Sequence, residues 1–377
     1  MKVLIVSQWQ WHGPARFARA LKNVGCEVAG LCGKGDLLAR TDFVDRFFYA
    51  DTSDELDVLR TLDLAIRAFR PDLILPASDN FVRTLQTYRK RVEAGKIDLD
   101  GDLVDVLHRC SFPPEAETLL NSKTDLLNAL AEKGVRIPPQ RDLQTFGDAD
   151  LFVQEHGYPV ILKPDQGSAS EGIRICRDEE SLIHHLNTLV FGRHQRRYCI
   201  QKYLGNQTAV IHFVAKEGNL LAWNMAYRLR THPGETGQTS AIQVIDNEEM
   251  LNTTRILCEM VGYNGMGAPQ FVVEDEGRGK AYLMELNPRM GTYVHLWQTI
   301  GTDLADALVK AWSGQQVQRK PAEVGRTVAL YPQETIRNPE SEFIKIQNDV
   351  PVGDKGLLAA YELMIQARGK KQPTMNP

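Results

Sequence analysis

The stretch that decides the fold of this 377-residue chain is "YLMELNPRMG", residues 282–291. Successive side chains of an extended strand point to opposite faces. Glu285, Asn287 and, if the strand continues, Arg289 therefore share one face. The opposite face carries the apolar side chains Tyr282, Met284 and Leu286. A carboxylate, an amide and a guanidinium at alternate positions indicate either a solvated sheet face or a binding site.

A second strand precedes this one. "QFVVE" (270–274) is strand-like, and the glycine-containing segment "DEGRGK" (275–280) predicts a hairpin turn. A hairpin centred on that turn pairs Gln270 with Glu285, about 5 Å apart at their β-carbons. Gln270, Glu285 and Asn287 would then place their side-chain oxygens on one face. Such donors suit Mg²⁺, which takes one or two carboxylates together with substrate phosphates.

Another pair of segments carries phosphate-binding chemistry. Lys163 ends the apolar strand "YPVILKP" (158–164), and the small-residue loop "GSASEG" (167–172) follows. Glycine and serine let backbone N–H groups turn toward an anion, and the lysine supplies a point charge. No Gly-Lys-Ser/Thr follows, so this is not a P-loop, and a plain hairpin loop is the alternative.

Lys123 and "QKYL" (201–204) are weaker signals. Lys123 lies in a predicted helix over 122–134, with Ser122 as its N-cap and Gly134 as its C-cap. By itself it is typical of a solvated lysine. "QKYL" ends a strand, where its backbone could serve a nucleotide base or simply close an ordinary strand.

Composition argues against several classes of protein. Hydrophobic residues make up 43% and charged residues 24% of the chain, as in ordinary globular proteins. The net charge of −4 gives no basic excess for nucleic acid. The apolar run in "MKVLIVSQWQ" is too short for a signal peptide, and no stretch approaches the roughly 20 residues of a membrane span, so we expect a cytoplasmic protein. The 6 cysteines lack zinc-site spacing and are expected to be free and mostly buried.

Strands and helices alternate over residues 1 to about 112, as in a parallel α/β unit. The strands are expected at 2–7, 26–32 and 71–78, and the helices at 14–25 and 54–69. The proline-rich "SFPPEA" (111–116) marks a boundary. From 198 to 286 strands dominate, with one helix at about 247–262, and helical character returns at 292–313.

Taken in order, these pieces resemble the ATP-grasp superfamily of ligases over roughly residues 1–315. The features that carry the resemblance are Lys123 in "SKTDLL", "GYPVILKP", "GSASEG", "QKYL" and "GAPQFVVE…YLMELNPRMG". The Gln, Glu, Asn triplet is similar to that of carbamoyl phosphate synthetase. "QKYL" looks like the hinge of biotin carboxylase. The ordered set is specific, whereas each piece alone is weak.

The resemblance implies an α/β fold with an α+β C-terminal part. A Rossmann-like parallel domain would span 1–115, a small lid subdomain 116–203, and a larger mixed α+β subdomain with the metal site 204–318. A partly frayed C-terminal segment, 319–377, would follow. ATP would be gripped between the lid and the larger subdomain. The oligomeric state stays open, a homodimer included.

The resemblance also implies a role for each matching residue. Lys123 and Lys163 would hold the α- and β-phosphates of ATP, beneath a loop containing Gly167, Ser168, Ser170 and Gly172. The remaining nucleotide contacts would come from Gln201, Lys202, Tyr203, Leu204 and Gln207, with backbone groups of Lys202 and Leu204 meeting adenine. Mg²⁺, as one or two ions, would be held by Gln270, Glu285 and Asn287. The catalytic residues would be Lys163 and Arg289, the latter steadying an acyl phosphate or the acceptor carboxylate.

Some positions depart from the family pattern. Gln201 and Gln270 stand where acidic residues are commoner, and Gln207 stands where a glutamate often binds ribose. One carboxylate then remains in the metal set. Fewer negative charges weaken the attraction for Mg²⁺, so a second ion is left open.

Three functions remain in competition. The first is an ATP-dependent carboxylate–amine ligase that forms a C–N bond through an acyl phosphate and releases ADP and phosphate. That chemistry needs positioning and charge neutralisation rather than a protein nucleophile. The second is bicarbonate activation, as in a carboxylase or carbamoyl phosphate synthetase. The third is a nucleotide-binding regulatory protein with weakened catalysis, motivated by the glutamines at acidic positions.

Substrate contacts are expected from loops, which vary most. "QWQWHGPA" supplies Trp11 and His12, which could flank a ligand or belong to a packed loop. Arg228 and Arg230 are predicted to lie on one strand face and to bind a carboxylate, together with Arg289. The expected partners are small-molecule carboxylates and amines, with neither nucleic acid nor a membrane.

Overall fold

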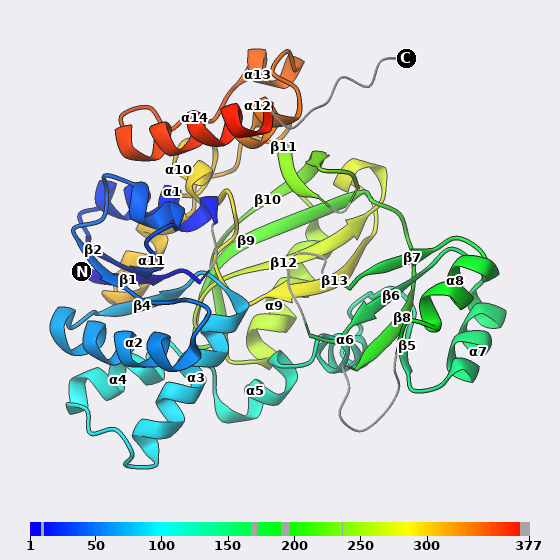
Figure 1. Ribbon diagram of the computed structural model, residues 1–377, viewed down its shortest axis with the longest axis horizontal. Helices are drawn as coiled ribbons and strands as arrows, with labels where there is room; N and C mark the ends of the chain where they lie inside the picture. The colour runs from blue at the N-terminus through cyan, green and yellow to red at the C-terminus, as the bar shows by residue number, and fades with distance from the viewer. Residues whose placement is uncertain (9–10, 167–171, 190–196, 236, 370–377) are drawn as a thin grey trace.

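The computed structural model describes residues 1–8, 11–166, 172–189, 197–235 and 237–369. A parallel sheet near the N-terminus, a small antiparallel sheet and a large antiparallel sheet organise the chain (Figure 1). The expected order of a parallel α/β unit, a small lid and a larger mixed unit is confirmed.

The N-terminal unit is a four-stranded parallel sheet in the order β3-β2-β1-β4. Its strands are β1 (Lys2–Val6), β2 (Glu27–Cys32), β3 (Arg46–Tyr49) and β4 (Leu73–Pro76). Its helices are α1 (His12–Asn23), α2 (Glu55–Phe69), α3 (Asp79–Glu93) and α4 (Gly101–Arg109), with a 3-10 turn η1 (Leu37–Arg40). The expected strands and helices of this unit are confirmed. Strand β3 and helices α3 and α4 were not predicted from the sequence.

The lid is a four-stranded antiparallel sheet in the order β5-β8-β6-β7. Its strands are β5 (Gln140–Leu143), β6 (Val160–Pro164), β7 (Arg174–Cys176) and β8 (Tyr198–Lys202). Helices α7 (Phe146–His156) and α8 (Glu179–Leu186) cover one face. Leu162, Phe152 and Ile200 belong to a separate core there, so the lid packs as a unit of its own.

The large sheet has six strands in the order β13-β12-β9-β10-β11-β14. They are β9 (Thr208–Lys216), β10 (Asn219–His232), β11 (Gln238–Ile245), β12 (Gly265–Val273), β13 (Ala281–Asn287) and β14 (Thr327–Ala329). One face packs against α9 (Glu248–Met260). The other face shares a continuous apolar core with β1, β2 and α1 and with α10 (Trp297–Ile300) and α11 (Leu304–Trp312), which joins the N-terminal unit to this sheet.

Helices α5 (Pro114–Leu120) and α6 (Lys123–Glu132) differ from the expected division at residue 116. Their apolar side chains belong to the core under the large sheet rather than to the lid. An amphipathic pattern shows that a helix packs on something, but it does not say which sheet. The Ser122 hydroxyl accepts from the Asp125 amide, so the predicted N-cap of α6 is confirmed. Gly134, with φ 84°, follows the helix end as expected.

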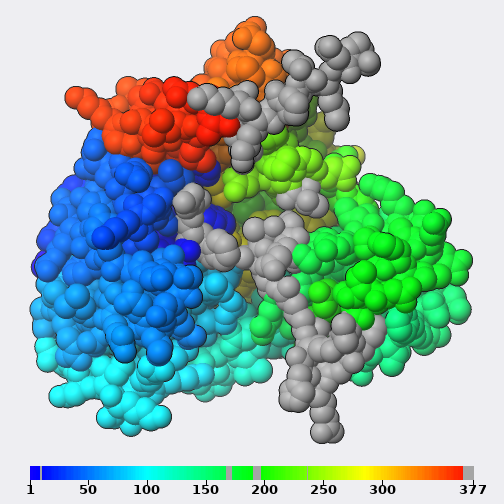
Figure 2. All heavy atoms as spheres, in the orientation of Figure 1, coloured from blue at the N-terminus to red at the C-terminus, as the bar shows by residue number. Residues whose placement is uncertain are grey.

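The C-terminal segment returns to the N-terminal unit. It contains β14, α12 (Gln333–Arg337), α13 (Glu342–Ile346) and α14 (Lys355–Gly369). Figure 2 shows α14, in red, directly against the blue N-terminal residues. The Tyr361 ring lies 5.2 Å from that of His12, and the Thr41 hydroxyl donates to Asp354 at 2.5 Å. The segment expected to be partly frayed is thus built into the fold through residue 369, and residues 370–377 lie outside the described ranges.

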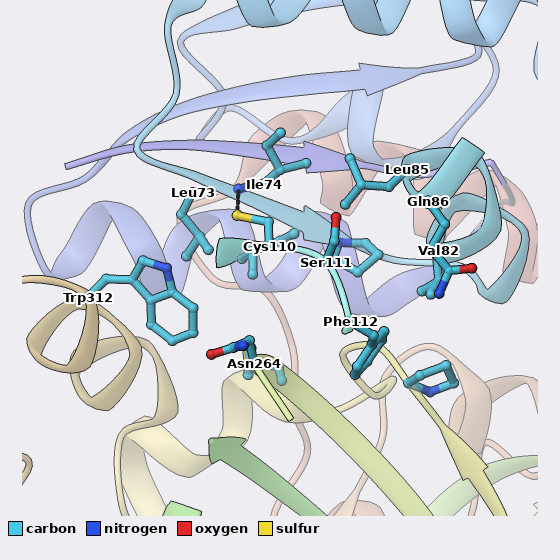
Figure 3. A pocket seen from close by; sticks show the side chains of 15 residues that line it. Leu73, Ile74, Val82, Leu85, Gln86, Cys110, Ser111, Phe112, Asn264 and Trp312 are labelled. Atoms are coloured by element: carbon cyan, nitrogen blue, oxygen red, sulfur yellow. Dashed lines mark hydrogen bonds between the residues drawn. The ribbon is translucent and has the colours of Figure 1, made fainter. Parts of the chain in front are cut away.

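The contact between the N-terminal unit and the large sheet is nearly close packed. Figure 3 shows the small cavity that remains there, between Leu73 and Ile74 on one side and Asn264 and Trp312 on the other. Its volume of ≈ 20 Å³ is room for about one water molecule. Pro288, which follows Asn287 in "YLMELNPRMG", forms part of its wall.

The cysteines are free, and all but Cys110 are fully buried, as predicted. Within the described ranges, no helix combines the length and the apolar character needed to cross a bilayer.

Gly291, the last residue of "YLMELNPRMG", leaves no room for a side chain, because neighbouring residues contact it on both sides. A Cβ on Gly291 would overlap Nε2 of the buried His212 on β9. His212 cannot easily turn away, since its Nδ1 accepts a hydrogen bond of 2.9 Å from Trp297. On the other side, a Cβ on Gly13 of α1 would lie 2.6 Å from the Gly291 carbonyl oxygen. The loop after β13 is therefore fixed between β9 and α1.

We expect Gly291→Ala to lower the free energy of unfolding by roughly 1–3 kcal/mol, because the added methyl overpacks this contact. Gly101→Ala is the control, since a Cβ at Gly101 meets nothing within 4 Å. Urea denaturation of both variants measures the difference. Equal stability of the two variants would show that the loop after β13 can move aside.

Candidate functional site

The hairpin of β12 and β13 pairs Gln270 with Glu285, as predicted. Nearer the turn, Phe271 pairs with Leu283, so the register shifts at Met284, which is the extra residue of a β-bulge. Leu283 and Leu286 both belong to the core under the sheet, whereas Met284 and Glu285 both line the cleft above it. The prediction that Met284 shares a face with Leu286 is therefore wrong, because the bulge interrupts the alternation of side chains.

Glu285 is an ionised acid held by a lysine. Its Oε2 accepts a hydrogen bond of 2.7 Å from Nζ of Lys123, the first residue of α6. The charge of Lys123 is the main cause that lowers the pKa of Glu285 from 4.5 to about 2, and it outweighs the desolvation that would raise it. Lys163 and Arg289 lower the same pKa further. Glu285 thus keeps its negative charge over the whole physiological range.

Lys163 on β6 is buried with only neutral partners. Its Nζ lies 3.4 Å from Oε1 of Gln201 and 3.5 Å from the carbonyl oxygen of Met284. Gln201 in turn donates to Oε1 of Gln140 at 3.0 Å. Burial lowers the pKa of Lys163, because no acid lies within ion-pair distance among the described residues. An anion bound in the cleft would stabilise the charged form of the Lys163 ammonium group.

Arg289 and Trp11 come together from different units of the chain. The guanidinium carbon of Arg289 lies 3.9 Å from the centre of the Trp11 ring. Its Nη2 donates to Oδ1 of Asn287 at 2.9 Å, and its Nε lies 3.3 Å from Oδ1 of Asp79. Asp79, at the start of α3, was not foreseen, because nothing in the sequence connects it to the β12–β13 hairpin. Trp11 belongs to the predicted substrate set, and here it covers one face of Arg289.

A cleft of ≈ 760 Å³, open solvent at its mouth included, lies between the lid and the large sheet. Its apolar walls are formed by Pro138, Ile161, Ile173, Ile175, Val272 and Met284. Its polar end is formed by Lys163, Arg228, Gln270 and Glu285. The apolar walls were not predicted from the sequence. The signal was the alternation in β6 and β7, where Ile161 and Ile175 face away from the core that holds Val160 and Leu162.

The predicted nucleotide contacts Gln201 to Leu204 line the cleft. The amide N–H of Lys202 donates a hydrogen bond of 2.8 Å to the Pro139 carbonyl. The amide N–H of Leu204 has no hydrogen-bond partner among the described residues, so it is available to a ligand. The Tyr203 hydroxyl donates to Oε2 of Glu235 at 3.1 Å.

Of the other predicted nucleotide contacts, some lie away from the cleft and some lie outside the described residues. Gln207 is exposed and does not line the cleft, whereas its neighbour Asn206 does. Gly172 is described, with φ 78°, and Ile173 beside it lines the cleft. The remaining loop residues of the prediction lie outside the described ranges: Gly167, Ser168 and Ser170.

The structure separates two pairs of predicted substrate residues. Arg228 lines the cleft, whereas Arg230 is exposed, with its guanidinium 5.2 Å from the centre of the Phe343 ring. The register of β10 shifts between them, which breaks the alternation that had placed both on one face. His12 packs against Tyr361 of α14, away from the cleft, although Trp11 beside it contacts Arg289. Arg230 and His12 are therefore not brought to the site.

The three predicted metal ligands are of the type that Mg²⁺ prefers, but they are too few to bind it without further oxygen donors. Glu285 and the amide oxygens of Gln270 and Asn287 are hard oxygen donors, and the acid is ionised. Oδ1 of Asn287 already accepts from Arg289, and Glu285 already holds Lys123. In the described part of the chain, no three His, Cys, Asp or Glu side chains cluster as a metal site. This donor set suits an ion whose shell is completed by phosphate oxygens.

Comparisons with known proteins agree with this geometry. A family profile described as an ATP-grasp domain matches residues 120–293. Biotin carboxylase 1 of Bacillus subtilis is 27% identical over 236 residues, covering 56% of this chain and 50% of its own. The C-terminal section of the carbamoyl phosphate synthase large chain of Aquifex aeolicus is 26% identical over 203 residues, covering 52% and 37%.

A solved structure extends the similarity to most of the fold. The biotin carboxylase domain of Hydrogenobacter thermophilus 2-oxoglutarate carboxylase, in complex with MgADP, ADP and bicarbonate, superposes with a TM-score of 0.62. It is 19% identical, and the match covers 86% of this chain and 72% of that one. The chain spans half or less of the length of the curated relatives named above. From the ordered motifs and the matching profile, residues 120–293 of this chain belong to the ATP-grasp superfamily.

Proposed function

We propose that this protein is an ATP-dependent ligase that joins a carboxylate to an amine through an acyl phosphate. The observation that carries the proposal is the surplus of positive charge at the polar end of the cleft. The cations near Glu285 are Lys123, Lys163, Arg228 and Arg289. The acids there are Glu285 itself, Asp79 and Glu235, which lines the cleft. Such a site favours a polyanion such as a nucleotide triphosphate, together with a carboxylate.

The apolar end of the cleft suits the base of the nucleotide. Ile161, Ile175 and Met284 provide apolar surface for a flat ring, and the free N–H of Leu204 can donate to a ring nitrogen. The phosphates would then extend toward Lys163. Both ends of ATP therefore find a matching environment along one cleft.

The reaction would proceed by two displacements. An oxygen of the carboxylate attacks the γ-phosphorus, the bond to the β–γ bridging oxygen breaks, and ADP leaves with that electron pair. The amine then attacks the acyl carbon, phosphate leaves with its electron pair, and the amine gives up a proton. Lys163 and Lys123 would neutralise phosphate charge in both steps, and Trp11 would hold Arg289 in place near the acyl group.

Gln270, Glu285 and Asn287 would hold Mg²⁺ together with the nucleotide. When bound, the ion would neutralise phosphate oxygens as a Lewis acid. Glu285 is suited to this role because it stays ionised, and Lys123 gives it a fixed position before the nucleotide arrives.

Bicarbonate activation is the second candidate. The curated relatives named above are a biotin carboxylase and a carbamoyl phosphate synthase, and the compared structure holds bicarbonate. Bicarbonate would take the place of the organic carboxylate in the first displacement. The two candidates therefore share the nucleotide site and differ in the anion that attacks the γ-phosphate.

A single assay separates these possibilities. ADP release is measured with MgATP and a panel of the common amino acids and small organic acids, with and without amines, and separately with bicarbonate. We expect release that requires both an organic carboxylate and an amine. Release that requires bicarbonate would favour the second candidate. Nucleotide binding without release under any condition would contradict both and would favour a regulatory role.

Glu285→Gln should lower the rate of ADP release at saturating ATP by at least roughly a hundredfold, because it removes the one ionised oxygen donor from the phosphate-binding end. Glu276→Gln is the control. Glu276 lies in the turn of the same hairpin, its side chain is 65% exposed, and it should keep wild-type activity. Equal rates for the two variants would show that the phosphates bind elsewhere.

The lowered pKa of Glu285 also predicts a pH-dependent stability. Because its pKa falls from 4.5 to about 2 on folding, the ionised group stabilises the folded state above about pH 4.5. This contribution is lost as the pH falls toward 2. The difference in free energy of unfolding between the wild type and Glu285→Gln should therefore shrink over that interval, as urea denaturation at several pH values would measure. A difference that stays constant with pH would contradict the ion pair with Lys123.

A further inference from the structure

The face of the large sheet that carries Glu285 also carries a second arginine. The register pairs Glu285 with Gln270, Gln270 with Val210, and Val210 with Ala226, so these residues form one row across β13, β12, β9 and β10. Arg228 lies two residues beyond Ala226 on β10 and points to the same face. It lines the cleft together with Gln270 and Glu285. The anion-binding surface therefore extends across the sheet to Arg228.

Arg228 and Arg289 differ in how many of their donors are in use. Arg289 donates to Asn287 and to the Met290 carbonyl, lies against Asp79, and is covered by Trp11. Arg228 makes one hydrogen bond, from Nη2 to the Gly237 carbonyl at 2.6 Å. Its Nε is buried without a hydrogen-bond partner, and it has no acid within ion-pair distance among the described residues. Nε of Arg289 also lacks a hydrogen-bond partner in the described part of the chain, but it lies 3.3 Å from Oδ1 of Asp79. Arg228 is therefore the arginine that lines the cleft without an ion-pair partner among the described residues.

Tyr293, packed on His212, carries a second buried donor, without a partner among the described residues, near this face of the sheet. Its side chain is 4% exposed, and its ring lies 4.7 Å from that of His212 on β9, one row away from Gln270. Its hydroxyl is buried without a hydrogen-bond partner in the described part of the chain. The phenol is close enough to Arg228 for the guanidinium to lower its pKa, although burial raises that pKa overall.

The buried, unpaired donors of Arg228 and Tyr293 destabilise the folded protein without a ligand. A buried polar group without a partner destabilises a fold by roughly 1–3 kcal/mol, and a buried charge by more. His212 cannot relieve Tyr293, because its Nδ1 is engaged by Trp297 and burial lowers its pKa to about 3, so the ring is neutral. Groups kept in this state, of which Arg228 lines the cleft, indicate a ligand that accepts hydrogen bonds.

We propose that Arg228 and Tyr293 form the subsite for the carboxylate that becomes phosphorylated. This rests on the function proposed above and assigns it a place: a planar carboxylate accepts from the guanidinium of Arg228 and the hydroxyl of Tyr293. Arg289, which donates to Asn287 and to the Met290 carbonyl and does not line the cleft, is then a positioning residue. The substrate class is an organic acid that presents a free carboxylate group to this pair of donors.

The test uses three variants of the full chain and a matched control. Tyr293→Phe removes only the hydroxyl, Arg228→Met removes the charge, and Arg228→Lys keeps it. Arg230→Met is the control, because Arg230 is exposed beside the same strand and does not line the cleft. Each is measured for melting temperature without ligand and for KM of ATP and of the carboxylate that gives ADP release with the wild type.

We expect Tyr293→Phe to raise the KM for the carboxylate by roughly tenfold and Arg228→Met by roughly a hundredfold, with the KM for ATP unchanged. Arg228→Lys should recover part of the loss. Without ligand, Tyr293→Phe should melt at the wild-type temperature, because its hydroxyl has no partner among the residues that the structure describes. Arg228→Met should melt close to it, because loss of the hydrogen bond to the Gly237 carbonyl is offset by removal of a buried charge. Arg230→Met should match the wild type in both KM values.

The proposal is overturned if Tyr293→Phe and Arg228→Met both melt at lower temperatures, since these groups would then be structural, or if the KM for the carboxylate does not change. A wild type that binds ATP but releases no ADP with any acid defeats the proposed function instead. In that case the melting temperatures alone decide whether Arg228 and Tyr293 are unsatisfied donors or structural groups.

Discussion

The ion pair between Glu285 and Lys123 is the contact on which the site depends. It joins β13 of the large sheet to the first turn of α6, and it sets an ionised carboxylate in the lining of the cleft. The charge of Lys123 keeps the acid ionised even though burial opposes it. The other cations are arranged around this one acid, so the local field favours an anion with more than one charge.

A second constraint fixes the geometry around that acid. The loop after β13 passes between His212 on β9 and Gly13 on α1, with no space for a side chain at Gly291. Arg289, in the same loop, is held by Trp11 from one unit and by Asn287 from the other. The N-terminal unit is therefore part of the site, and the C-terminal segment supports it by packing Tyr361 on His12, next to Trp11.

Much of the fold and part of the site could be predicted from the sequence. The pairing of Gln270 with Glu285 follows from the turn between two strands, and the cap at Ser122 follows from its residue type. What failed depended on irregular backbone. The bulge at Met284 and the register shift after Arg228 each move side chains to another face, and neither has a sequence signal.

Other features depend on contacts between distant segments. Asp79 and Tyr293 reach the site through tertiary packing alone, and the choice of the large sheet as the partner of α6 was equally hidden. Residue types indicated the nucleotide chemistry, because lysines, an acid and a small-residue loop occur in a fixed order. The missing partners of the buried Arg228 and Tyr293 donors depend on how the surrounding segments pack, which residue types do not indicate.

The most direct measurement is a crystal structure of the protein with ADP and Mg²⁺. The account predicts a base between Ile161 and Met284 that accepts from the Leu204 N–H, with phosphates near Lys163 and the ion on Gln270 and Glu285. A nucleotide bound outside this cleft, or an ion that contacts neither Gln270 nor Glu285, would contradict it.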